Sequence, residues 1–188
     1  MSRLAAVALL ASLAASPVLA DDAGDFMQKF SGDWLGTGQL LFGPQFGTKF
    51  NCELEGSPNK TQLVFGMHGR CWMGSMVGPV HAQLRYNAET NRFYGEFMDG
   101  GDGNGVDIVG LRDGEGFTLN LTRGPIQGKL VAAAVGGDQM TMMLSIRDKA
   151  HDRDFPVIAM GFTRKSASEL GLPAYMPPEV TGSITAAK

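Results

Sequence analysis

The sequence has little of what many functional classes require. It contains only two cysteines and three histidines, has no Cys-x-x-Cys motif, and carries no block of basic residues. Its formal net charge of −3 argues against a nucleic-acid-binding surface, which needs clustered positive charge. It also has no nucleophile elbow, no paired-carboxylate motif and no metal-ligand spacing. We therefore expect no enzyme activity, no bound metal and no cofactor.

Only one long apolar run is present, and it lies at the N-terminus. Arg3 precedes residues 4–15 (LAAVALLASLAA), Pro17 breaks the run, and residues 18–20 (VLA) precede Asp21. This pattern is typical of a secretory signal peptide, and the run is shorter than the roughly 20 residues that span a bilayer. Asp21, in place of a cysteine, argues against a lipid anchor. We expect residues 1–20 to be removed and the mature chain, without a membrane span, to be periplasmic or secreted.

Helical periodicity is scarce, and residues 22–30 (DAGDFMQKF) are the one segment expected to form a short helix. The rest of the chain is rich in glycine and consists of short runs of alternating polarity separated by turn signals. Such runs predict antiparallel strands. We expect strands at residues 34–42, 48–55, 61–73, 77–86, 92–98, 106–112, 117–122, 130–134, 139–147 and 155–164.

The connections between these strands are too short for the crossover helices that parallel pairing needs. Consecutive strands should therefore pair in up-and-down order. A twisted sheet of this many strands tends to close on itself, which removes its exposed edges. The prediction is an all-β fold: an antiparallel up-and-down β-barrel of about 8–10 strands at residues 21–165, favoured over a sandwich. A short N-terminal helix precedes it, and an irregular Pro-containing tail at residues 166–188 either packs on the barrel or is disordered.

Two cysteines in an exported chain most simply form a disulfide, here Cys52 to Cys71. Both fall on strand positions expected to point inward; two buried thiols or a redox pair are the alternatives. In a simple hairpin these residues would place the midpoint between Thr61 and Gln62, three residues after the strongest turn signal at residues 57–59. A β-bulge or an offset between the strands is therefore expected.

Residues 32–38 (GDWLGTG) open the first expected strand. A Gly-x-Trp motif after a short helix and before a series of hairpins resembles the calycin superfamily of lipocalins and related barrels. The resemblance implies that Trp34 closes one end of the barrel beneath an arginine of the last strand, for which Arg164 is suitably placed. The Thr-Asp-Tyr triplet of lipocalins is absent.

The fuller pattern Gly-x-Trp-x-Gly-x-Gly resembles nitrobindin-type barrels, in which a histidine near the C-terminus ligates haem iron. The matching region here, residues 155–165 (FPVIAMGFTRK), contains no histidine. His68 and His81 are expected to point outward, and His151 lies in a charged loop. Haem binding is therefore the third of three functional alternatives.

The leading alternative is a pocket for a small hydrophobic ligand, lined by Phe65, Met67, Phe97, Met142 and Met160. Methionine adapts to irregular apolar shapes, and a barrel of about ten strands has more interior than its side chains readily fill. The methionines are equally consistent with core filling. The second alternative is then a ligand-free envelope protein, an inhibitor or assembly factor, that acts by protein contact. A cavity of roughly 300 Å³ or more would favour the ligand.

Two further features have open interpretations. Residues 99–107 (DGGDGNGVD) offer oxygen ligands for a cation such as calcium, but they match no calcium-loop spacing and are interpreted as a solvated loop. A set of apolar residues expected to point outward indicates a protein or membrane contact, or a surface covered by the C-terminal tail. These residues are Trp72, Met73, Met76, Tyr94, Met98 and Met143.

Overall fold

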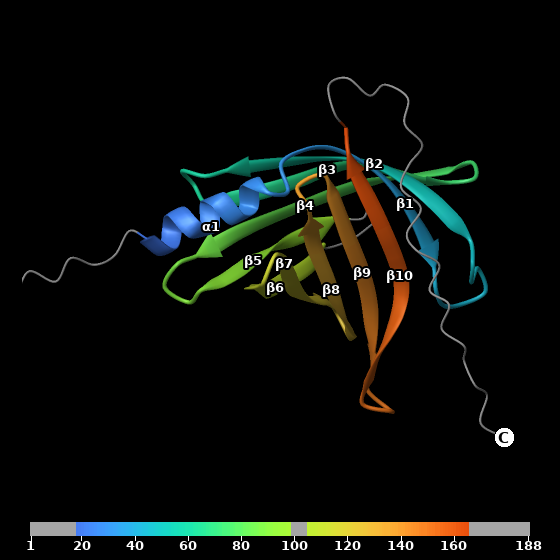
Figure 1. The fold of residues 1–188 in the computed structure, drawn as a ribbon. Helices are drawn as coiled ribbons and strands as arrows, with labels where there is room; N and C mark the ends of the chain where they lie inside the picture. Colours follow the sequence, from blue (N-terminus) through green and yellow to red (C-terminus); the bar gives the residue numbers. More distant parts are fainter. Residues whose placement is uncertain (1–17, 99–104, 166–188) are drawn as a thin grey trace, which may run out of the picture.

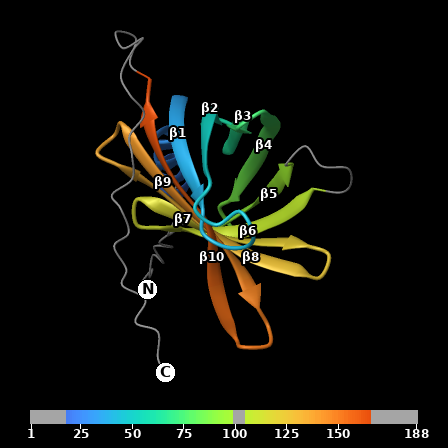
Figure 2. The ribbon, with the colours of Figure 1, turned by 90° about the vertical axis from the view of Figure 1, so that its right-hand side faces the viewer.

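The computed structural model describes residues 18–98 and 105–165. Within them, ten antiparallel strands form one closed barrel in which neighbours in the chain are neighbours in the sheet and β1 pairs with β10 (Figures 1 and 2). This confirms the predicted all-β, up-and-down barrel. Helix α1 (Val18–Gln28) precedes the strands β1 (Gly32–Leu40), β2 (Lys49–Asn59), β3 (Val64–Met73), β4 (Met76–Asn87), β5 (Arg92–Met98), β6 (Val106–Asp113), β7 (Gly116–Arg123), β8 (Ile126–Val135), β9 (Gln139–Asp148) and β10 (Arg153–Arg164).

Three expectations lie wholly or largely outside the described residues. They are the signal peptide at residues 1–20, the aspartate-rich segment 99–107 and the tail at residues 166–188. The expected short helix is present, but it begins at Val18 rather than at residue 22. Among the residues that are described, no helix has the length and apolar character needed to cross a membrane.

Helix α1 covers one end of the barrel with a single apolar face. Ala23, Phe26 and Met27, with Phe30 just after the helix, recur at the 3.6-residue period, and each is at most 5% exposed. The helix ends in tight turns, since the backbone N–H groups of residues 29–31 donate to carbonyls three residues earlier. Gly32, at φ 96°, then redirects the chain into β1.

The aromatic rings at this end pack around Phe117 of β7. Its ring centroid lies 4.9 Å from Phe26, 4.7 Å from Phe30 and 4.9 Å from Phe93. Two of these pairs are edge-to-face, the geometry that aromatic quadrupoles favour. Each buried Phe contributes about 1.5–3 kcal/mol of transfer free energy. The helix-covered end is therefore the densely packed part of the core.

Strand β1 is glycine-rich because large rings occupy the space beside it. A Cβ on Gly36 would stand 2.2 Å from the ring of Phe162, and one on Gly38 would stand 2.2 Å from the ring of Phe50. Both distances are far below van der Waals contact. Gly36 and Gly38 thus make room for the rings of Phe162 on β10 and Phe50 on β2.

The β2–β3 hairpin corrects the expectation of a bulge. Cys52 faces Cys71, and the register continues without a shift to Asn59 opposite Val64. The connection is residues 60–63, so β2 runs through the turn signal at residues 57–59. Its pairing with β1 ends at Gly56, which lets Pro58 lie in the strand. Asn59 holds the turn by accepting a hydrogen bond from the backbone of Gln62, 3.0 Å.

Two placements at strand ends also differ from expectation. Strand β1 ends at Leu40 instead of residue 42, which leaves Phe42 exposed in the β1–β2 loop. Met73 packs partly buried against the core instead of pointing outward, because it lies two residues from Cys71 and shares its face of β3. The side chain of Met98 lies outside the described residues.

The glycine contacts predict a specific loss of stability. We expect Gly36→Ala to lower the free energy of unfolding by roughly 1–3 kcal/mol, because the added methyl forces the Phe162 ring from its site. Urea denaturation measures this. Gly78→Ala is the matched control, since a Cβ there meets nothing within 4 Å. Equal stability of the two variants would show that the ring does not constrain residue 36.

Candidate ligand-binding cavity

A cavity of about 400 Å³ lies inside the barrel, and all of its twenty lining residues are apolar. They come from β2 to β10 and from Phe30 after the helix. Alternation along each strand supplies them, as Val80, Ala82 and Leu84 show on β4. Strand β1 contributes none: its central inward positions are Gly36 and Gly38, which have no side chain, and Trp34 lies at the helix-covered end.

The structure brings together the five residues that the sequence indicated. Phe65, Met67, Phe97, Met142 and Met160 all line this cavity. They come from four strands, β3, β5, β9 and β10, so only closure of the sheet brings all of them to one cavity.

Sequence reasoning missed the aromatic residues at the helix-covered end of the cavity. Phe30 lines the cavity from outside the sheet, beside Phe117. The apolar spacing of Phe26 and Phe30 on the expected helix was the available signal, since one helical face that apolar must be buried. Small side chains also matter, because Ala82 and Ala132 line the wall and leave space that larger residues would fill.

The lining determines what the cavity can accept. It offers no side-chain hydrogen-bond donor or acceptor of ordinary strength. A buried polar group without a partner costs about 1–3 kcal/mol, and an isolated charge costs far more. The part of a ligand inside the barrel must therefore be apolar and uncharged.

A haem ligated by histidine does not fit these residues. The three histidines lie on the outside of the barrel and are exposed. His68 Nε2 is 3.2 Å from Glu55 Oε2, and His151 Nδ1 is 2.6 Å from Asp148 Oδ2. No imidazole reaches the cavity, so the resemblance to haem-binding barrels does not extend to the iron ligand.

Trp34 and Arg164 meet at the seam of the barrel, as the sequence indicated. They are direct cross-strand partners on β1 and β10, and the guanidinium carbon lies 4.3 Å from the indole ring centroid. Trp34 is fully buried, and its indole N–H donates to the Phe30 carbonyl at 3.1 Å. The stack seals the barrel beside the end of the helix.

Arg164 also holds three backbone carbonyls. Nη2 donates to Lys29 O at 2.7 Å, Nη1 donates to Ser31 O, and Nε donates to Gly137 O at 3.0 Å. Partial burial lowers the pKa of this guanidinium, while the charge of Asp138 opposes that shift. An arginine keeps its charge at neutral pH, so the site holds a cation over the indole.

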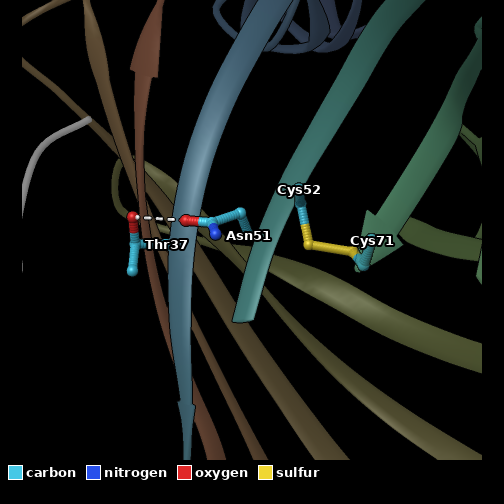
Figure 3. Close-up of a disulfide and its surroundings, with 4 residues drawn as sticks. All are labelled: Thr37, Asn51, Cys52 and Cys71. Atoms are coloured by element: carbon cyan, nitrogen blue, oxygen red, sulfur yellow. Dashed lines mark hydrogen bonds between the residues drawn. A yellow bond between two sulfur atoms is a disulfide. The ribbon is translucent and has the colours of Figure 1, made fainter. Parts of the chain in front are cut away.

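The disulfide joins β2 to β3 at the cavity wall (Figure 3). Cys52 and Cys71 face each other with their Cα atoms 4.0 Å apart. Cys52 is buried and Cys71 lines the cavity. The predicted pairing is confirmed, and it links two strands of the wall covalently.

Two depressions on the outer wall differ from the cavity in chemistry. One of about 320 Å³ includes Lys129 and Arg147, each of which forms a salt bridge with Asp154. One of about 380 Å³ lies over β4, β5 and β6 and is lined mainly by polar residues. Among the described residues, no group of three or more His, Cys, Asp or Glu is arranged to hold a metal ion. Of these three sites in the described part of the chain, the interior cavity is the one with a wholly apolar lining.

Comparisons with known proteins identify the fold. No protein-family model matches the chain, and no curated protein sequence matches it. Among solved structures, Rv2717c from M. tuberculosis is similar, with a TM-score of 0.57 and 13% identity over 77% of this chain and 98% of that one. The S-type phycobiliprotein lyase CPES from Guillardia theta gives a TM-score of 0.49 and 11% identity over 76% and 92%. The closed ten-strand barrel and the first likeness fit a calycin-like fold.

The second likeness corrects one expectation. We expected no enzyme activity because the sequence lacks catalytic motifs, but one similar barrel carries the name of a lyase, which is an enzyme. The absence of a motif therefore does not support the conclusion that this chain is not an enzyme. A likeness at this TM-score assigns no activity to it either.

The geometry at the seam predicts that lysine cannot replace Arg164. Because one ammonium group cannot reach three separate carbonyls and stack on an indole, we expect Arg164→Lys to lower the free energy of unfolding by roughly 1–3 kcal/mol. Urea denaturation followed by Trp fluorescence measures it. The control is Arg85→Lys, an exposed site on β4, where the change should be small. A stable Arg164→Lys variant would contradict this role.

Proposed function

We propose that this chain is an exported barrel protein that binds a small apolar ligand in the barrel interior. One observation carries the proposal: a cavity of about 400 Å³ with a wholly apolar lining. That volume lies in the usual range of small-molecule sites, about 300–1,000 Å³. A ligand-free protein that acts by contact has no need of such a space, and a barrel filled to its axis would be more stable without it.

The lining supports a ligand with an uncharged hydrocarbon or aromatic body. Aromatic rings of Phe30, Phe65 and Phe117 form one part of the wall, and Met67, Met142 and Met160 form others. Methionine side chains adapt to ligands of irregular shape. Any polar group of the ligand must lie away from Phe30, toward the end of the barrel that helix α1 does not cover.

Two features of the sequence support export. Residues 1–20 have the pattern of a signal peptide. The Cys52–Cys71 bond is of the kind that persists in oxidising compartments. We further propose that the chain belongs with the lipocalin-like calycins, on residues 32–38 and the Trp34–Arg164 stack. Haem is not part of the proposal, since the histidines are outside.

Titration with a neutral fluorescent probe tests ligand binding. We expect N-phenyl-1-naphthylamine to give a saturable, one-to-one rise in fluorescence with the wild-type protein. Ala82→Phe puts a ring into the cavity and should weaken binding by about tenfold or more. Gln83→Phe is the matched control, because the next residue of β4 is exposed on the outer face and its ring leaves the cavity unchanged.

Native mass spectrometry gives an independent measurement on the same variants. We look for a small molecule that co-purifies with the wild type and with Gln83→Phe but not with Ala82→Phe. Its mass would identify the class of the natural ligand. Two results would contradict binding inside the barrel: fluorescence that does not saturate with the wild type, or an equal loss of probe binding in Ala82→Phe and Gln83→Phe.

Export has its own test. We expect the protein recovered from the periplasm of a bacterial host to have the intact mass of residues 21–188 less two hydrogens. Denatured but unreduced, it should show no reactive thiol. Retention of residues 1–20 would contradict export. Two reactive thiols would contradict the formation of the disulfide.

A further inference from the structure

One part of the outer barrel wall carries no charge. It lies on β8, β9, β10 and β1, which are neighbours around the barrel (Figure 1). Outward side chains alternate with inward ones along each strand, and cross-strand pairing arranges them here in three consecutive rows. The rows are Val131, Met143, Ala159 and Gln39; Ala133, Thr141, Gly161 and Thr37; and Val135, Gln139, Thr163 and Leu35. We call this set the uncharged face.

The opposite part of the wall is charged. The outward positions of β2 to β5 carry side chains of both signs, among them Glu53, Glu55, Arg70, Arg85 and Glu96. On the uncharged face, by contrast, Val131 is 42% exposed, Met143 44% and Val135 48%. Val131 and Met143 are direct cross-strand partners, so these exposed side chains are contiguous. A contiguous apolar surface without charge is typical of a surface that another segment covers.

The described chain ends beside the uncharged face. The backbone N–H of Lys165 donates to the carbonyl of Asp33 at 2.7 Å, and Thr163, two residues earlier, belongs to the third row. The sequence continues with residues 166–188. Five residues span at most about 17 Å, so a segment that begins at residue 170 can reach each of the three rows.

Residues 170–178 (LGLPAYMPP) match the uncharged face in chemistry. They carry no charge, and their leucine, tyrosine and methionine side chains supply apolar surface. Because the barrel is closed, its wall offers side chains but no free strand edge, and a segment lying on it cannot pair its backbone with the sheet. The prolines of this segment have no backbone N–H to satisfy. Proline also restricts the chain beforehand, which lowers the conformational entropy lost on docking.

We propose that residues 170–178 pack across the uncharged face as an intramolecular strap. The inner side of the same strands lines the cavity through residues such as Ala132, Met142 and Met160. The strap therefore lies on the outside of one part of the cavity wall. This proposal does not depend on the proposed function, since the contact is made on the outer surface whether or not a ligand occupies the interior.

A second copy of the chain fits the uncharged face less well. Neighbouring strands are about 4.8 Å apart and residues rise about 3.4 Å along a strand, so the face measures roughly 15 by 15 Å between its outermost Cα atoms. That extent is well below the roughly 800 Å² per partner that a stable interface buries. Nine residues, at most about 30 Å long when extended, are enough to cross the face from corner to corner.

Methionine oxidation tests the docking, because Met143 lies on the uncharged face whereas Met76, 57% exposed, lies on β4. Hydrogen peroxide converts accessible methionine to the sulfoxide. We expect Leu172→Ser with Tyr175→Ser, made in the mature chain, to raise the oxidation rate of Met143 by about threefold or more, because the strap no longer shields it. The rate of Met76 should stay the same. Peptide mass spectrometry measures both rates.

Val180→Ser with Ile184→Ser is the matched control for this variant. It also removes two apolar side chains after residue 165, but outside residues 170–178. Met143 should then be oxidised as slowly as in the wild type. Thermal unfolding confirms that both double variants fold.

A change on the uncharged face itself gives a reciprocal measurement. Val131→Lys puts a charge into the first row and should release the strap, so that Met176 is oxidised about threefold faster than in the wild type. Gln83→Lys is the matched control, because residue 83 is exposed on β4, away from the face. Met176 should be oxidised at the wild-type rate in that variant.

Four outcomes would overturn the proposal. The first is an equal oxidation rate of Met143 in the wild type and in both double variants. The second is a rise at Met76 as well as at Met143, which would show that the segment stabilises the whole barrel instead of covering this face. The third is an equal rate of Met176 in the two lysine variants. The fourth is a dimeric wild type whose Met143 loses its protection on dilution, because a second copy would then cover the face.

Discussion

The stack of Arg164 on Trp34 joins the last strand to the first, and the closed barrel depends on that seam. The two residues are direct partners across the β1–β10 pairing. Arg164 also donates to the carbonyls that end the helix and to Gly137 in the β8–β9 turn. One cation thus ties the seam, the helix end and a turn together. Because the sheet closes there, the described barrel has no free edge for another strand to pair with.

The cavity follows from an uneven distribution of side-chain volume. Rings from helix α1 and four strands fill the helix-covered end around Phe117. Further along the axis, the small side chain of Ala82 faces inward and leaves space. This empty space lowers the stability of the fold, because the residues that line it lack the packing contacts that larger side chains would provide. Such a cost is consistent with a binding role, because a ligand restores the missing contacts only when it is present.

The two ends of the barrel differ in chemistry as well as in packing. The helix-covered end buries a cluster of aromatic rings beneath helix α1. The other end exposes Phe42, Phe46, Met76, Val77 and Ile126. The proposed ligand binding is consistent with this difference, because helix α1 leaves the second end of the barrel uncovered.

The sequence by itself determined which side chains face inward along a strand. Alternation is a local property with a period of two, so Phe65, Met67, Phe97, Met142 and Met160 were identifiable without any tertiary information. The number of strands and the up-and-down order followed from turn signals and short connections. Turn residues were less reliable guides to the register of the strands. Residues 57–59 lie in β2 because its pairing with β1 ends at Gly56, which allows Pro58 in the strand. The expected bulge is therefore absent. Only the tertiary structure decided that Phe30 lines the cavity, that Phe42 lies outside the barrel wall, and that the interior is hollow. Those outcomes depend on distances between segments far apart in the chain, and on volumes summed around a closed wall, which no local pattern encodes.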